Sequence, residues 1–159
     1  MFFPPELEGH VTFSGRGAAP NDKWIESFVV KGFSPGTSNL LWTTNTTTNN
    51  TGVFTMTGLT PGTYDIGIKG GTGLSELNTS VTLTAGVTTV VDFGTIRVGD
   101  ANIDDYITIS DRTLLYGGWG TGEGDPGWRP YCDFNNDGYL TISDRTLLYG
   151  NWGQSGDLS

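Results

Sequence analysis

The sequence has few residues from which a disulfide framework or a histidine-rich metal site could be built. Cys132 is the single cysteine and His10 the single histidine among 159 residues. One cysteine cannot form an internal disulfide or a cysteine-based zinc site. One histidine excludes every metal site that needs two imidazoles.

Basic side chains and long apolar runs are scarce as well. Eight Lys and Arg face 17 Asp and Glu, so the net charge is −9 and the pI about 4.2. Without a basic cluster we expect no nucleic-acid partner. No apolar run approaches the roughly 20 residues of a membrane span. The first residues lack the pattern of a signal peptide, so either a signal has been removed or the chain is a piece of a longer protein.

The acidic residues are concentrated in the last third of the chain. Residues 1–98 carry seven acidic and five basic side chains, whereas residues 99–159 carry ten acidic and three basic ones. A hydrophobic content of 35% with 25 glycines would suit a disordered chain, but five Trp, eight Phe and six Tyr provide a core, and 16% charged residues are too few for a self-repelling coil. We therefore expect a folded protein.

The first two thirds predict short strands. Runs of Val, Ile, Phe, Tyr and Thr alternate with Gly, Pro and Asn, a pattern typical of an antiparallel β-sandwich. The expected strands are 11–13, 24–33, 39–44, 53–57, 64–69, 77–84 and 88–92. We predict a mainly β fold with a small α part at the C-terminus: an N-terminal extension over 1–8, an Ig- or prealbumin-like antiparallel β-sandwich over 9–98, and a separate domain over 99–159.

The stretches Thr51–Phe54 and Leu59–Ile66 resemble the carboxypeptidase regulatory-like and Cna B-type modules, which are prealbumin-like sandwiches. The resemblance implies a non-catalytic spacer module common in secreted and surface proteins. Some relatives form a Lys–Asn/Asp isopeptide bond, and Lys31 with Asp92 could lie on neighbouring strands, although a surface ion pair is the simpler interpretation. Three N-glycosylation patterns begin at Asn45, Asn49 and Asn78.

The acidic third is a duplication with an offset of 33 residues. Residues 106–120 and 139–153 differ only at Ile107/Leu140 and Gly118/Asn151. A period near 33 is also found in helical solenoids, but two copies separated by a Gly/Pro-rich insert do not fit such an array.

Each copy has oxygen-bearing residues at positions 1, 3, 5, 7 and 12 of a calcium loop. Ca²⁺ takes six to eight oxygens at roughly 2.3–2.6 Å, and position 7 contributes its backbone carbonyl. Solvated, helix-capping turns are the alternative, and the repetition argues against them. Mg²⁺ is disfavoured by its stricter octahedron. We therefore predict two Ca²⁺ ions. The ligands would be Asp100, Asn102, Asp104, Tyr106 and Asp111 in the first loop, and Asp133, Asn135, Asp137, Tyr139 and Asp144 in the second.

A short helix is expected after each loop. Ser110 and Ser143 would be its N-caps, and Gly117 and Gly150 would end it after about two turns. The two helices would pack antiparallel with pseudo-twofold symmetry. At position 6, Gly138 suits a left-handed backbone, and Asp105 would adopt it with modest strain while adding a negative charge near the cation.

The duplicated loop and helix resemble a type I dockerin over residues 99 to about 153. The resemblance implies docking into a cohesin module outside the cell. The family's recognition positions correspond to Ile109, Ser110, Tyr116 and Gly117 in one copy and to Ile142, Ser143, Tyr149 and Gly150 in the other. Many dockerins have basic residues where this chain has Tyr-Gly, which departs from the pattern. Tyr116, Tyr149, Trp119 and Trp152 fit a core and a binding face equally well.

The sequence leaves three functions to consider. The first is a non-catalytic, extracellular or cell-surface, calcium-binding tethering module that docks to a cohesin-like partner. The second is a self-assembling subunit of a surface layer or fibre that binds copies of itself through the segment Phe2–Glu6. The third, an enzyme, lacks catalytic motifs, so we predict none.

Overall fold

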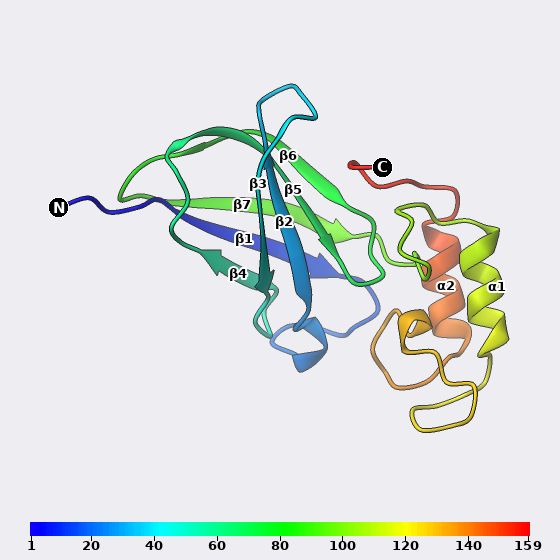
Figure 1. The fold of residues 1–159 in the computed structure, drawn as a ribbon. Helices are drawn as coiled ribbons and strands as arrows, with labels where there is room; N and C mark the ends of the chain where they lie inside the picture. Colours follow the sequence, from blue (N-terminus) through cyan, green and yellow to red (C-terminus); the bar gives the residue numbers. More distant parts are fainter.

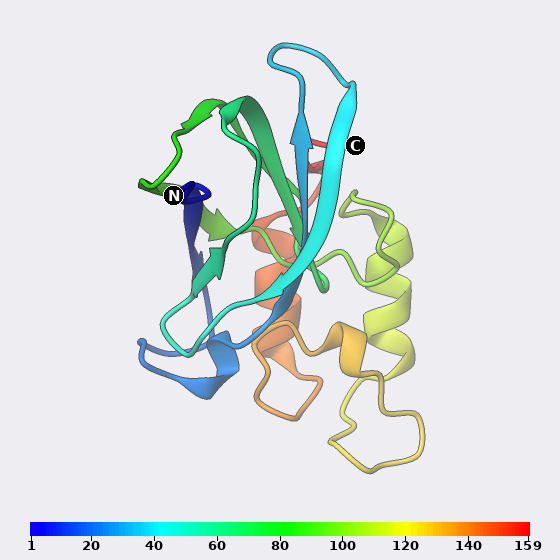
Figure 2. The same cartoon turned by 60° about the vertical axis from the view of Figure 1, so that its left-hand side comes forward.

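The computed structural model describes residues 1–159 as two β-sheets packed face to face, with two short helices at one end (Figures 1 and 2). The strands are β1 Glu6–Phe13, β2 Ser27–Phe33, β3 Leu40–Thr47, β4 Val53–Met56, β5 Gly62–Gly70, β6 Glu76–Leu83 and β7 Thr88–Ile96. The helices are α1 Ile109–Gly117 and α2 Ile142–Gly150, and the 3₁₀ turns are η1 Asp22–Trp24 and η2 Pro130–Cys132. The predicted β-sandwich with a small helical part is confirmed.

The sheets have the strand orders β4-β1-β7 and β3-β2-β5-β6. All pairs are antiparallel except β1 with β7, which is parallel, so the prediction of a purely antiparallel sandwich was wrong. Parallel neighbours need a long connection. The chain between β1 and β7 provides it, because it builds the other five strands first. Lys31 on β2 and Asp92 on β7 lie in different sheets, so they are not the neighbours that an isopeptide bond needs.

Strand boundaries differ from the prediction mainly at the ends. β1 begins at Glu6, inside the expected N-terminal extension, because its backbone bonds to β4 on one side and β7 on the other. Trp24 belongs to η1 rather than to β2, since Asn21 caps a 3₁₀ turn there with its side chain. A run of apolar residues does not show that the chain turns before it extends, so the sequence pattern merged the two elements.

One hydrophobic core runs through the sandwich and into the helical part. Phe28, Phe54 and Phe93 line up between the sheets with ring centroids 6.0–6.5 Å apart. The same cluster of 24 buried residues continues through Val98 and Ala101 to residues beneath the helices. Those residues are Ile107, Leu115, Cys132, Phe134, Leu140 and Leu148. The two parts therefore share apolar packing.

Polar contacts reinforce this junction. Arg16, only 3% exposed, forms an ion pair with Glu26 at 2.6 Å and donates to the carbonyl oxygen of Phe134 at 3.2 Å. On the opposite side, the backbone N–H of Asp157 donates to the carbonyl oxygen of Ser75 at 3.1 Å. The residues after α2 thus return to the sandwich, and Figure 1 shows the C-terminus lying beside β5 and β6. The helical part is held from both sides.

Candidate functional site

The two copies of the duplicated sequence form the same loop and helix. Each helix begins one residue after a threonine, Thr108 or Thr141, whose hydroxyl accepts from the backbone N–H two residues on. The predicted N-caps Ser110 and Ser143 lie inside the helices, so that prediction was wrong. The extended backbone of a cap residue is found two positions earlier than expected because Asp111 and Asp144 complete capping boxes by accepting from the threonine N–H groups.

The first carboxylate of each loop accepts hydrogen bonds from backbone N–H groups of the same loop. In the second loop, Asp133 accepts from the backbone N–H groups of Asp137 at 3.1 Å and Gly138 at 2.9 Å. Asp100 accepts in the same way from Asp104 at 3.0 Å and Asp105 at 2.9 Å in the first loop. A turn of this kind points positions 1, 3 and 5 toward one centre. The backbone at position 6 is left-handed in both copies, as predicted, with φ of 66° at Asp105 and 86° at Gly138.

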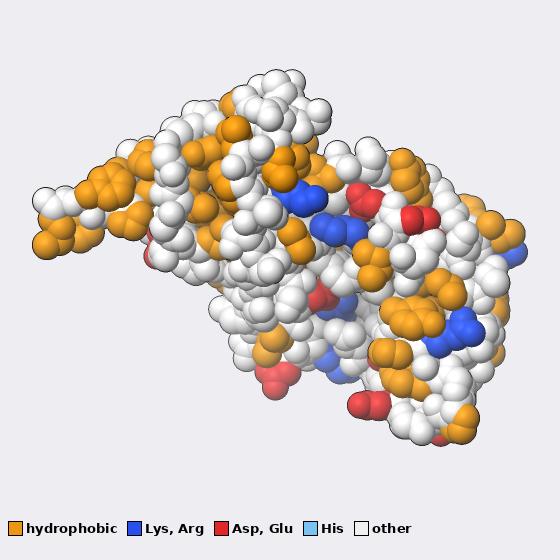
Figure 3. All heavy atoms as spheres, viewed as in Figure 1, with side chains coloured by type: hydrophobic (Ala, Val, Ile, Leu, Met, Phe, Trp, Pro, Cys, Tyr) orange, Lys and Arg blue, Asp and Glu red, His pale blue; other side chains and the backbone are white.

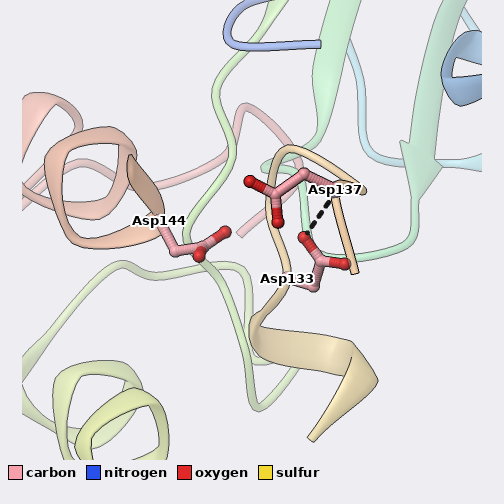
Figure 4. Close-up of side chains that lie close together, drawn as sticks. All are labelled: Asp133, Asp137 and Asp144. Carbon is pink, nitrogen blue, oxygen red and sulfur yellow. Dashed lines mark hydrogen bonds between the residues drawn. The ribbon is translucent and has the colours of Figure 1, made fainter. Parts of the chain in front are cut away.

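The second loop gathers three carboxylates. One ligand oxygen each of Asp133, Asp137 and Asp144 lies within 4.8 Å of the others, and Figure 4 shows the three side chains converging from the loop and from the start of α2. Asp144 is fully buried and Asp133 is 8% exposed. No Lys, Arg or His nitrogen lies within 4.0 Å of any of the three.

Burial opposes the negative charge of two of these carboxylates, Asp133 and Asp144. Burial raises the pKa of Asp144 to about 6, although hydrogen bonds from the Thr141 and Phe134 backbones act in the opposite direction. Burial also raises the pKa of Asp133. Converging oxygens that lack a positive partner and are costly to ionise match the donor set of a hard divalent cation. The second loop therefore fits Ca²⁺.

The other predicted ligands occupy matching places in both loops. Asn102 and Asn135 each donate from the side-chain amide to the position-5 carboxylate, at 2.8 and 2.9 Å. The side chains of Tyr106 and Tyr139 are 46% and 61% exposed, which agrees with a position that uses only its carbonyl. Ile107 and Leu140, which follow them, are fully buried and anchor each loop to the core.

The first loop differs from the second in its neighbours. Lys69, on β5, places its Nζ 2.8 Å from Asp100 Oδ2 and 3.9 Å from Asp105 Oδ1. The carboxylate of Asp105 also accepts from the Ser75 backbone N–H at 2.7 Å and from its hydroxyl at 2.5 Å. Asp105 thus bonds to the sandwich instead of adding an unpaired charge near a cation, which corrects the expectation for this residue. The sequence did not show the role of Lys69, because 30 residues separate it from the loop.

The helices present an exposed aromatic surface. Tyr116 packs on Trp119 and Tyr149 on Trp152, each with ring centroids 5.3 Å apart, and all four side chains are 40–43% exposed. Arg112 lies 5.9 Å over the Trp152 ring and Arg145 5.9 Å over the Trp119 ring. Since each pair joins the first turn of one helix to the end of the other, the helices run antiparallel. The aromatic residues are therefore surface and not core.

The other residues at the predicted recognition positions are exposed as well. Ile109 and Ile142 are each 59% exposed, and Ser110 and Ser143 are exposed beside them. Figure 3 shows hydrophobic side chains with nearby basic groups on the helical side of the molecule. The surface has two nearly identical halves, since each half combines residues of both copies.

The three N-glycosylation patterns lie in the sandwich, as does the single histidine, whereas the single cysteine lies in the buried core. Asn45 is exposed, the carbonyl oxygen of the Asn49 side chain accepts from Thr51 and Val53, and the amide of Asn78 donates to Asp92 at 3.2 Å. His10 bonds to Glu8 on β1 at 2.7 Å. Cys132 is fully buried, which raises the pKa of its thiol to about 12.

The comparisons with known proteins give a fold and no family. The sequence matches no protein-family model and no curated protein. Two solved structures are similar over nearly the whole chain. Both are mutants of a type II cohesin–X-dockerin complex from Acetivibrio cellulolyticus, one changed at the N-terminal and one at the C-terminal interface.

The N-terminal interface mutant gives a TM-score of 0.75 at 19% identity, and the C-terminal interface mutant gives 0.76 at 18%. Each match covers 96% of this chain and 97% of the other. At this identity the likeness shows the fold alone. No helix of the structure is long and apolar enough to cross a membrane.

Proposed function

We propose that this chain is a non-catalytic, extracellular tethering module that binds Ca²⁺ through two loops and docks by its helical face to a cohesin-type partner. The observation that carries the proposal is the repeated loop and helix. Its second copy brings together three carboxylates that have no positive partner. Calcium would complete both loops and fix the helices that bear the docking surface.

The calcium assignment is supported by chemistry as well as by spacing. Asp111 and Asp144 are fully buried, and each uses its two oxygens on backbone N–H groups at the start of its loop and helix. A buried carboxylate is costly unless it is paired. A divalent ion held by oxygens of the same loop would balance that charge and is plentiful outside cells.

The docking assignment is supported by the exposed surface. Aromatic residues and Arg are enriched at the centres of protein interfaces. Tyr116, Trp119 and Arg145 combine these types in one half of the surface, and Tyr149, Trp152 and Arg112 combine them in the other. A cohesin is the partner we propose because the helical pair resembles a dockerin and because the similar folds come from cohesin–X-dockerin complexes.

Binding to a purified type II cohesin tests the proposal. Sedimentation velocity with about 10 mM CaCl₂, roughly tenfold or more above the dissociation constants of about 0.1–1 mM of extracellular calcium modules, should give a one-to-one complex that disappears in excess EDTA. Asp137→Ala should weaken binding because it removes a convergent carboxylate, whereas Asp92→Ala, which changes an exposed acid on β7 of the sandwich, should leave it unchanged. Concentration-dependent polymers of the chain alone would instead support the self-assembling subunit. If the chain forms neither a complex with the cohesin nor polymers of its own, both functions are refuted.

A further inference from the structure

The two loops resemble each other in structure, but they make different contacts with the sandwich. The first loop receives a charged side chain: Lys69 Nζ lies 2.8 Å from Asp100 Oδ2, and the carboxylate of Asp100 is fully buried. The second loop receives Arg16, but its guanidinium donates to the backbone carbonyl of Phe134 and forms its ion pair with Glu26. The carboxylates of the second loop therefore have no basic partner from the sandwich.

We propose that Lys69 makes the two calcium sites unequal, so that the second loop fills first and the first loop binds Ca²⁺ more weakly. This inference rests on the proposed calcium-binding function. It assigns to Lys69, a residue of the sandwich, the role of a positioning residue that sets the affinity of the first loop from outside the loop.

The electrostatic reason is direct. The Lys69 ammonium already balances the negative charge of Asp100. If Asp100 bound a cation, only its carboxylate group would separate that cation from the ammonium. A positive charge at such a distance repels a divalent ion even when water screens the interaction, with an effect on the order of tenfold in affinity. The second loop has no such charge, because no basic nitrogen lies within 4.0 Å of its carboxylates.

The same contacts balance the charge of the first loop without an ion. Lys69 holds Asp100 while Ser75 holds Asp105, so two residues of the loop are anchored to the sandwich. In the second loop, Gly138 replaces Asp105 at position 6 and has no side chain with which to make such a contact. The second loop thus gains more from the cation, since only the ion can balance its carboxylates.

The site-resolved order of filling tests the proposal without changing Lys69. Calcium titration calorimetry of the whole chain should give two steps of different affinity. Asp104→Ala should remove the weaker step and Asp137→Ala the tighter one, because each removes the position-5 ligand of one loop. Equal steps, or loss of the tighter step in Asp104→Ala, would overturn the proposal.

Variants of Lys69 test the cause. Lys69→Met should strengthen the weaker step by roughly tenfold and leave the tighter step unchanged. Lys69→Arg should keep the wild-type difference because it keeps the charge, and Lys31→Met, on the neighbouring strand β2, is the matched control. Equal effects of the Met variants at positions 69 and 31 would refute the role of Lys69. Absence of calcium binding in every protein would instead refute the proposed function, and this inference with it.

Discussion

Removal of calcium should destabilise the whole molecule in one transition. The hydrophobic cluster continues from the sandwich to Leu115 and Leu148 beneath the helices, and Arg16 joins the sandwich to the second loop. Loosening the loops therefore exposes core that the sandwich also uses. We expect a single cooperative melting curve with and without calcium, shifted as a whole, although the sequence suggested two separate domains.

The size of the shift follows from binding linkage. An ion present at about 100 times its dissociation constant stabilises the folded state by about 2.7 kcal/mol per site. For a chain of this length, a change of about 1 kcal/mol alters Tm by about 2–4 °C. One filled site therefore raises Tm by about 5–11 °C, and two filled sites approach twice that value.

Differential scanning calorimetry in excess EDTA and in excess CaCl₂ measures this shift, with MgCl₂ as the control ion. Near-UV circular dichroism of the tryptophans follows the unfolding of both the sandwich and the helical part. Trp24 lies in the sandwich core, and Trp119 and Trp152 lie at the helices. An unchanged Tm would refute the calcium assignment. Two separate transitions in EDTA would refute the shared core instead.

Three further predictions concern pH, the junction and the exposed surface. Because burial raises the pKa of Asp144 to about 6, the calcium-free protein should lose on the order of 1–3 kcal/mol of stability as the pH rises from about 4 to 6, where the folded state binds more protons than the unfolded state. Chemical denaturation in EDTA at several pH values measures this loss, which Asp144→Asn should abolish. Arg16→Ala should cost about 3–5 kcal/mol because it removes a buried guanidinium and leaves the Glu26 carboxylate, whose side chain is only 13% exposed, without its partner, whereas Lys23→Ala, at an exposed site, should change stability by less than about 0.5 kcal/mol in urea denaturation. Changing Trp119 and Trp152 together to Ala should leave Tm within about 2 °C of the wild type while weakening cohesin binding by about 2–4 kcal/mol in calorimetry; unchanged affinity would place the docking surface elsewhere.

Local features of the fold followed from local sequence. The strand expected over 53–57 is found as β4, in which the alternating apolar residues Phe54 and Met56 are both buried. The 33-residue repeat predicted two equal helices because a loop and its following helix are specified by adjacent residues. The parallel pairing of β1 with β7 was not predicted, since it depends on which distant strands meet and no local pattern records that choice.

For the candidate calcium site and the helices beside it, the sequence likewise predicted the local features and left the tertiary contacts open. The spacing of Asp, Asn and Tyr predicted the ligands of each loop, because a tight loop of fixed length brings alternate side chains to one centre, and in the second loop the structure brings Asp133, Asp137 and Asp144 together. The sequence left the four helix aromatics open between core and surface, and the tertiary structure placed them on the surface because Leu115 and Leu148 already fill the space beneath the helices.

The sequence by itself determined that the acidic third of this chain consists of two equivalent loops. Only the tertiary structure decided that they are not equivalent in the folded protein. Lys69 and Ser75 reach the first loop from β5 and from the turn before β6, while Arg16 reaches only the backbone of the second. The physical reason is that a repeat specifies its own contacts, whereas the charge around each copy depends on residues that folding brings from far away in the chain.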